Sequence, residues 1–173
     1  GRLTIGTNDY EGSLDNAGEN ITLTDASGTI IESFNFDDTL PWPQASDGEG
    51  FSLVRISPSL QLDPNLPSSW RASTTVGGNP GGSDATIFSG GDLITYALQD
   101  KKLTPTKTGI KAPKNLAADD LIQEVQISTD LKNWATLSDP TQESLPEDGF
   151  TIETYEVEPI TQTTFYRLKV TIR

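Results

Sequence analysis

Acidic side chains are the residues whose type and spacing come closest to a chemical site in this chain. Asp37, Asp38, Asp47 and Glu49 lie within one short stretch, and carboxylate oxygens are ligands that calcium prefers. Their spacing does not follow the EF-hand loop, which alternates its ligands and closes with a glutamate. Two interpretations stay open, a calcium-binding loop and a solvated acidic loop, and the irregular spacing favours the solvated loop.

Two more pairs of carboxylates are formed by residues that are adjacent in the sequence, Asp119-Asp120 and Glu147-Asp148. Adjacent side chains of a strand point to opposite faces of a sheet. A glycosidase needs two carboxyl groups that face each other across a cleft. We therefore interpret both pairs as solvated turns.

The residue types that most often act as base, nucleophile or metal ligand are missing. The chain contains no His, no Cys and no Met. Without His, the commonest general base is absent, and without Cys, thiol nucleophiles and Cys-type zinc sites are excluded. Ser52, Ser73 and Ser128 have no His partner, and no Gly-x-Ser-x-Gly motif occurs. The sequence predicts a protein that is not an enzyme and has no catalytic, cofactor-binding or metal-ligating residues and no cofactor.

The three tryptophans, Trp42, Trp70 and Trp134, allow two interpretations. They form either a platform on which a sugar stacks or aromatic anchors of a hydrophobic core, and large aromatics of β-sandwiches more often belong to the core. An exposed, coplanar pair would favour carbohydrate binding, whereas buried rings would favour packing.

The net charge of −13 is spread unevenly. Residues 1–100 hold 14 acidic and 3 basic residues, and residues 101–173 hold 11 acidic and 9 basic residues. Phosphate backbones are bound by basic side chains, so we expect no nucleic-acid partner. The longest apolar runs are only a few residues, which predicts no membrane span and no signal peptide in this chain.

Short alternating segments separated by turns predict an all-β fold with one helix. The helix is expected at Asp92–Gln99, where Asp92 can cap it. Lys101–Lys114 carries five Lys, no acidic residue and two Pro, and we interpret it as a linker or edge segment. Strands are expected at Asn20–Thr24 and Thr29–Phe36, which form a hairpin, and at Phe51–Ile56, Trp70–Thr75, Leu121–Ser128, Trp134–Leu137, Phe150–Val157 and Thr164–Ile172.

Several short motifs between Gly12 and Gly81 occur in an order that resembles the lamin tail domain. They are Leu14-Asp15-Asn16-Ala17-Gly18-Glu19, Ile21-Thr22-Leu23-Thr24-Asp25, Gly28, Phe34-Asn35-Phe36, Trp42-Pro43, Asp47-Gly48-Glu49-Gly50, Ser52-Leu53, Trp70-Arg71-Ala72-Ser73 and Gly78-Asn79-Pro80-Gly81. The resemblance implies an immunoglobulin-like β-sandwich that serves as an adaptor, of the type found in exported bacterial proteins. Only Arg2-Leu3-Thr4-Ile5 precedes Gly12, so the front strands of the family pattern are absent. We therefore expect an open sheet edge that permits self-association.

The end of the chain resembles a C-terminal β-module of large exported bacterial proteins. The resemblance rests on Ser128-Thr129-Asp130-Leu131-Lys132-Asn133-Trp134 and Phe165-Tyr166-Arg167-Leu168. The expected organisation is a partial lamin tail-like sandwich at residues 1–85, a helix and Lys-rich linker at 86–114, and an antiparallel β-module at 115–173. We expect Tyr166, Leu168, Val170 and Ile172 to cover the apolar face that the missing strands leave open.

The favoured function is that of an extracytoplasmic, non-catalytic interaction or display module of a larger exported bacterial protein. Its expected partner is a protein or a surface polymer. Two alternatives are a carbohydrate-binding module with an aromatic face and a fragment of an enzyme whose catalytic part lies upstream.

Overall fold

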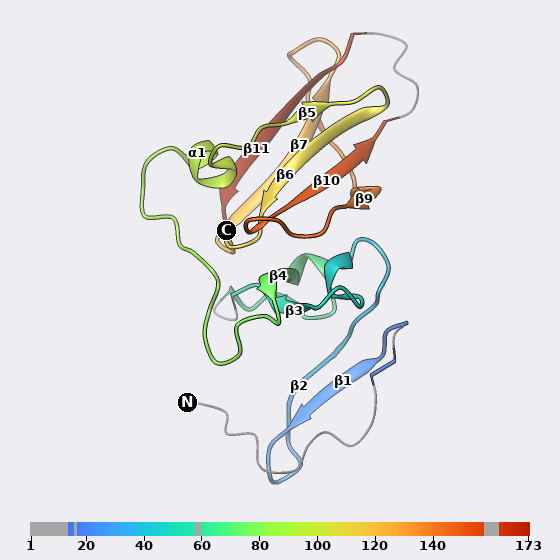
Figure 1. Ribbon diagram of the computed structural model, residues 1–173, viewed down its shortest axis with the longest axis vertical. Coiled ribbons are helices and arrows are strands. Elements are labelled where there is room, and N and C mark those ends of the chain that lie inside the picture. Colours follow the sequence, from blue (N-terminus) through green and yellow to red (C-terminus); the bar gives the residue numbers. More distant parts are fainter. Residues whose placement is uncertain (1–13, 16, 58–59, 158–162) are drawn as a thin grey trace.

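The protein is built from antiparallel β-sheets with one short α-helix among the residues described (Figure 1). The computed structural model describes residues 14–15, 17–57, 60–157 and 163–173, so Arg2–Ile5, Gly12 and Asn16 of the lamin tail resemblance lie outside them. The expected all-β class is confirmed, and no helix of the described residues is long and apolar enough to cross a membrane. The elements are β1 (Asn20–Thr24), β2 (Ile30–Asn35), β3 (Phe51–Arg55), β4 (Trp70–Val76), α1 (Leu93–Leu98), β5 (Thr104–Pro105), β6 (Gly109–Asn115), β7 (Leu121–Ser128), β8 (Ala135–Thr136), β9 (Gln142–Glu143), β10 (Phe150–Glu156) and β11 (Phe165–Ile172).

The β1–β2 hairpin forms where the sequence predicts it and extends away from the rest of the molecule (Figure 1). The Asp25 carboxylate closes its turn by accepting hydrogen bonds from the backbone nitrogens of Ser27 at 2.8 Å and Thr29 at 2.9 Å. Ile21 pairs with Phe34 across the hairpin. Each of the two strands therefore has one edge that no other described strand pairs with.

A second two-stranded sheet, β3–β4, packs against the hairpin through aromatic rings. The Phe34 and Trp70 ring centroids lie 4.6 Å apart, and those of Trp42 and Trp70 lie 6.4 Å apart. Stacked aromatics of this kind bury much apolar area at one point. In the part of residues 1–85 that the structure describes, the expected sandwich consists of these two small sheets alone.

The C-terminal unit is a larger β-sandwich in the upper part of Figure 1. One sheet has the strand order β5-β6-β10-β9 and the other the order β11-β7-β8. Ile110, Ala112, Val125 and Tyr155 form the buried core, against which Leu168 and other partly buried side chains pack. On β6 the exposed Lys111 separates the buried Ile110 and Ala112, as expected for a strand whose alternate side chains face the core.

The interpretation of Lys101–Lys114 as a linker is wrong for its second half. β6 pairs over its whole length with β10 and also with β5, so it is an inner strand. Ile110 and Ala112 point into the core, while Lys111 points outward, and this alternation was hidden among the Lys residues. Pro113 has no backbone N–H to donate. It is tolerated because the pairing of β6 with β5 ends at Lys111, so no hydrogen bond to β5 is required at Pro113.

Gly109 marks the start of β6 for a steric reason. A Cβ atom at this position would clash with the backbone carbonyl oxygen of Tyr155 on the paired strand. Only glycine allows the two backbones to approach so closely. Gly109 thereby allows the pairing of β6 with β10 to continue to Glu156.

Helix α1 is confirmed, with Asp92 as its N-cap. The Asp92 carboxylate accepts a 2.7 Å hydrogen bond from the Thr95 backbone nitrogen. Ala97 is fully buried against Ala118 and Leu121, so the helix covers one end of the sandwich.

The two halves of the molecule share a small apolar core. Leu116, which follows β6, packs with Ala45, Ala72 and Phe51 of the N-terminal half. The expectation that the residues of β11 make this contact is wrong. Tyr166 and Leu168 pack inside the sandwich and Val170 packs near α1, because the paired sheet and the helix already supply apolar surfaces for them; Ile172 is exposed.

Candidate functional site at the junction of the two halves

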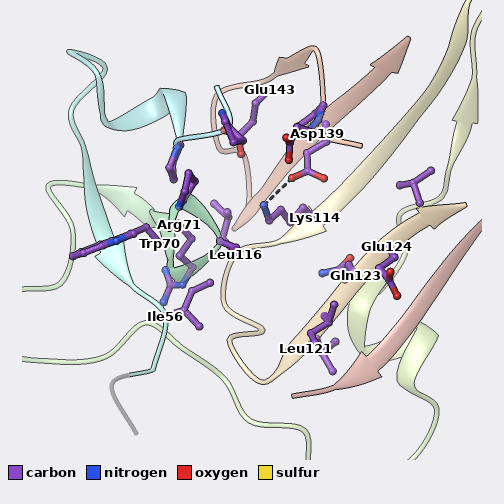
Figure 2. Close-up of a pocket in the computed structure, with 18 of the residues that line it drawn as sticks. Ile56, Trp70, Arg71, Lys114, Leu116, Leu121, Gln123, Glu124, Asp139 and Glu143 are labelled. Carbon is purple, nitrogen blue, oxygen red and sulfur yellow. Dashed lines mark hydrogen bonds and ion pairs between the residues drawn. The ribbon is translucent and has the colours of Figure 1, made fainter. Parts of the chain in front are cut away.

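A cleft of about 640 Å³ lies between the N-terminal half and the sandwich (Figure 2). Trp70 and Arg71 of β4 line one wall, and Lys114 of β6 lines the other. Its volume falls within the range of small-molecule sites. The charged residues inside it decide what it can do.

Lys114 and Glu153 form the central ion pair of the cleft. The Lys114 ammonium nitrogen lies 2.7 Å from Glu153 Oε1, and the Tyr155 hydroxyl donates to Glu153 Oε2 at 2.6 Å. Both oxygens of this carboxylate are therefore occupied. Burial lowers the pKa of Lys114, but the charge and hydrogen bond of Glu153 together with the charge of Glu143 outweigh this effect and leave that pKa raised, so the ammonium stays protonated.

Glu143 stands directly across from Glu153, since the two residues are Cα partners of β9 and β10. Like charges at such positions repel, and Lys114 reduces this repulsion. Burial raises the pKa of Glu143, while Lys114 partly opposes the shift. Glu143 Oε2 accepts a hydrogen bond of 3.3 Å from the backbone nitrogen of Gln44, which ties the loop before β3 to the sandwich.

The sequence provided no signal for this facing pair of carboxylates. Gln142 and Glu143 form a two-residue strand without apolar alternation, so neither its existence nor its register could be predicted. A facing pair is the arrangement that glycosidases use. Here Lys114 of β6 and Tyr155 of β10 both bind the Glu153 carboxylate. The Lys114–Glu153 ion pair therefore links β6 to β10.

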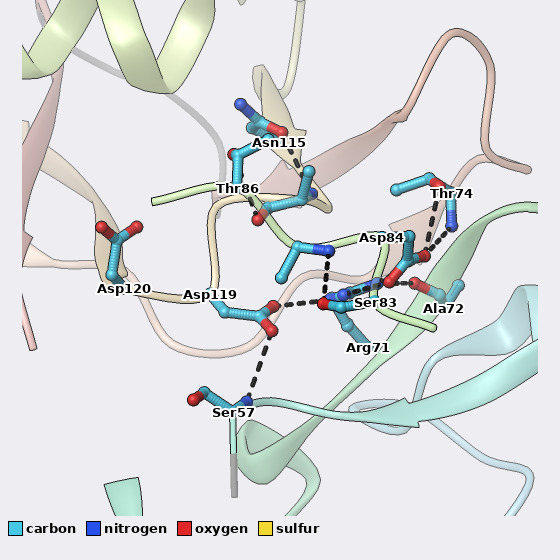
Figure 3. Close-up of polar contacts among 12 residues, drawn as sticks. Ser57, Arg71, Ala72, Thr74, Ser83, Asp84, Thr86, Asn115, Asp119 and Asp120 are labelled. Atoms are coloured by element: carbon cyan, nitrogen blue, oxygen red, sulfur yellow. Dashed lines mark hydrogen bonds and ion pairs between the residues drawn. The ribbon is translucent and has the colours of Figure 1, made fainter. Parts of the chain in front are cut away.

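A second charged cluster joins the halves beside the cleft (Figure 3). Arg71, whose side chain is 3% exposed, binds Asp84 through Nη2 at 2.6 Å and Asp119 through Nε at 2.6 Å. Asp84 also accepts from the Thr74 backbone nitrogen at 2.9 Å. Hydrogen bonds from Arg71 lower the pKa of Asp84 to about 2, so this carboxylate is ionised at neutral pH.

The interpretation of Asp119-Asp120 as a solvated turn is therefore wrong. Asp119 is buried against Arg71. Asp120 accepts hydrogen bonds from the Phe88 backbone nitrogen at 2.6 Å and the Tyr96 hydroxyl at 3.2 Å. The partners of both carboxylates are distant in sequence, so the sequence could not identify them. Glu147-Asp148 is exposed, as expected.

The structure places three of the four acidic residues of the predicted loop around one groove. Asp37, Asp38 and Asp47 line a second, smaller groove, and Glu49 does not. Among the described residues, no three acidic side chains converge closely enough to hold a metal ion. The described loop thus gives no support to a calcium site.

The tryptophans do not form an exposed platform. Trp42 is 7% exposed and Trp70 is 9% exposed, and both belong to the core. Trp134 is half-buried, and the Arg167 guanidinium lies 4.2 Å from its ring centroid. The packing interpretation is confirmed for Trp42 and Trp70, and Arg167 already occupies a face of Trp134.

Comparison of the chain with protein-family models, curated proteins and solved structures finds no match. The lamin tail resemblance accordingly stays a prediction.

Proposed function

We propose that the chain is a non-catalytic protein-interaction module of a larger exported bacterial protein. The observation that carries the proposal is the exposed apolar surface of the β1–β2 hairpin. Ile30 is 62% exposed and Ile31 is 60% exposed, although Ile normally avoids water. Apolar side chains left exposed on strands with unpaired edges are typical of surfaces that bind a partner.

The junction cleft supports a non-catalytic function. Its strongest acid–base candidates, Glu153 and Lys114, are paired with each other, and Arg71 is bound to two carboxylates. A general acid or base has to reach a substrate, and these groups are engaged in connecting strands. In this proposal the Lys114–Glu153 pair joins β6 to β10 within the sandwich, and the Arg71 cluster holds the two halves together.

The proposal also gives the C-terminal unit an immunoglobulin-like architecture, in place of the one expected for residues 1–85, and the strand order of that unit supports it. The order β5-β6-β10-β9 corresponds to strands A, B, E and D of an immunoglobulin sandwich when β7 is counted as strand C and β8 as the additional strand C′. Sandwiches of this kind often serve as binding scaffolds. The exported location rests on the resemblance to exported bacterial proteins.

Site-specific photo-crosslinking tests the interaction. A photoreactive amino acid replaces Ile30 in the full-length protein, which is irradiated in its own cells, and adducts are identified by mass spectrometry. We expect one discrete adduct from position 30 and none from position 156 in β10, where Glu156 is exposed. Absence of any adduct from the hairpin would contradict the proposal.

A substrate panel tests the absence of catalysis. We expect no turnover of esters, phosphodiesters or glycosides by the chain. Turnover that disappears in Glu143→Gln would show that the facing carboxylates are catalytic and would overturn the proposal.

A further inference from the structure

A second groove, of about 370 Å³, lies between the β1–β2 hairpin and the β3–β4 sheet. Its floor is apolar and comes from both sheets. Because each sheet has two strands in the part of the chain that the structure describes, the described strands leave their facing surfaces incompletely covered. The apolar residues that line the groove are Leu14, Ile21, Phe34, Phe36, Leu53 and Trp70.

Four carboxylates line the same groove, from Asp15, Asp37, Asp38 and Asp47. Among the described residues, no Lys or Arg forms an ion pair with any of them. This contrasts with the junction, where Asp84 and Asp119 are both bound by Arg71. The groove therefore combines an apolar floor with carboxylates that no Lys or Arg of the described residues pairs with.

We propose that this groove binds a short segment of a partner protein in which an aliphatic or aromatic residue is flanked by lysines or arginines. The apolar side chain enters between the two sheets. The long stems of the flanking basic residues lie along apolar surface and bring their charges to the carboxylates. This inference rests on the proposed function and names the chemistry of the partner.

Charge distinguishes this occupant from a second copy of the chain. Residues 1–100, which form the groove, hold 14 acidic and 3 basic residues. A second copy would bring like charge to a negative surface, and like charges across an interface disfavour association. A basic segment gains attraction at the same place.

Three synthetic peptides test the chemistry by isothermal titration calorimetry against the whole chain. The first contains Leu and Phe residues flanked by Lys, the second has Glu in place of Lys, and the third has Ser in place of Leu and Phe. We expect binding of the first peptide only, together with a change in the fluorescence of Trp70 at the floor of the groove. Added salt should weaken the binding, because exposed charges are screened.

Matched variants locate the binding. The triple variant Asp15→Asn, Asp38→Asn, Asp47→Asn should weaken binding of the first peptide about tenfold, as expected for the loss of three exposed ion pairs. The control triple Asp100→Asn, Glu147→Gln, Glu156→Gln removes the same charge from exposed positions outside the groove and should change the affinity by less than about twofold. Leu14→Ser removes an apolar side chain that is 56% exposed and should weaken binding while leaving the far-UV circular dichroism unchanged.

Equal binding of the three peptides, or equal loss in the two triple variants, would overturn the inference. A concentration-dependent dimer that Leu14→Ser dissociates would also overturn it and would identify a second copy as the occupant. If the inference fails while the Ile30 cross-link still forms, the interaction function stands and only the partner chemistry is wrong.

Discussion

The two halves of the molecule are built from the same kind of element but are stabilised differently. The C-terminal sandwich has sheets of four and three strands that enclose a shared core. The N-terminal half, in the part that the structure describes, has two sheets of two strands, and residues 1–100 hold most of the negative charge. Two-stranded sheets are marginally stable in water, so the N-terminal half depends on the sandwich through Leu116 and the Arg71 cluster. The half that depends on its neighbour is also the half that holds the acidic groove.

Of the substitutions considered, removal of the Asp119 carboxylate should lower the stability of the N-terminal half the most. Asp119→Ala leaves the buried guanidinium of Arg71 with one partner fewer and should cost about 3–5 kcal/mol of the free energy of unfolding. Urea unfolding followed by tryptophan fluorescence measures it, since Trp42 and Trp70 report on the N-terminal half. Asp100→Ala, which removes an exposed carboxylate 3.5 Å from Lys101, is the control and should cost less than about 1 kcal/mol. Equal losses in the two variants would contradict the role of the cluster.

Truncation of two buried residues separates the halves. Leu116→Ala and Ile110→Ala should each cost about 2–5 kcal/mol, because each leaves a cavity in a core. Leu116→Ala should release the N-terminal half first, so the near-ultraviolet signal of the tryptophans is lost before the far-ultraviolet signal of the sandwich. Ile110→Ala should shift the unfolding transitions of the near-ultraviolet and far-ultraviolet signals together, toward milder unfolding conditions. Identical unfolding profiles would show that the halves form one cooperative unit.

The prediction at low pH concerns Asp84, whose pKa is lowered to about 2 mainly by hydrogen bonds from Arg71. A carboxylate whose pKa is lower in the folded than in the unfolded chain stabilises the fold above the unfolded value of 3.8, and this contribution is lost as the pH falls toward 2. The contribution is about 2 kcal/mol. The difference in stability between the wild type and Asp84→Asn should therefore shrink between pH 5 and about pH 2. A difference that does not depend on pH would contradict the pairing with Arg71.

The smallest effect is expected at the exposed face of the hairpin. Ile30→Ser with Ile31→Ser should change the free energy of unfolding by less than about 0.5 kcal/mol for each substitution, because both side chains are already solvated. Urea unfolding checks this. A loss of several kcal/mol would mean that this face is covered within the molecule.

The sequence predicts the elements whose patterns are local and fails where a distant partner decides the structure. The hairpin, α1, β7 and β11 follow from alternation, turn residues and a cap. β6 was missed because its Lys residues and Pro113 hide a buried alternation that only the pairing with β10 reveals.

The candidate sites show the same limit. Asp119 looks like a solvated turn because its partner, Arg71, lies 48 residues earlier. The pair of Glu143 and Glu153 exists only through the register of a two-residue strand. Asp37, Asp38 and Asp47 of the groove stand close together in the sequence, but their relation to an apolar floor appears only when the two small sheets come together.

Hydrogen exchange followed by mass spectrometry tests the central claim most directly, because it measures the stability of each half in the same molecule. The account predicts slow exchange for backbone amides of β6, β7, β10 and β11 and exchange faster by orders of magnitude for β1 and β2. Asp119→Ala should accelerate exchange in β3 and β4 while leaving the sandwich unchanged. Equal protection in both halves, or an equal response of both halves to Asp119→Ala, would contradict it.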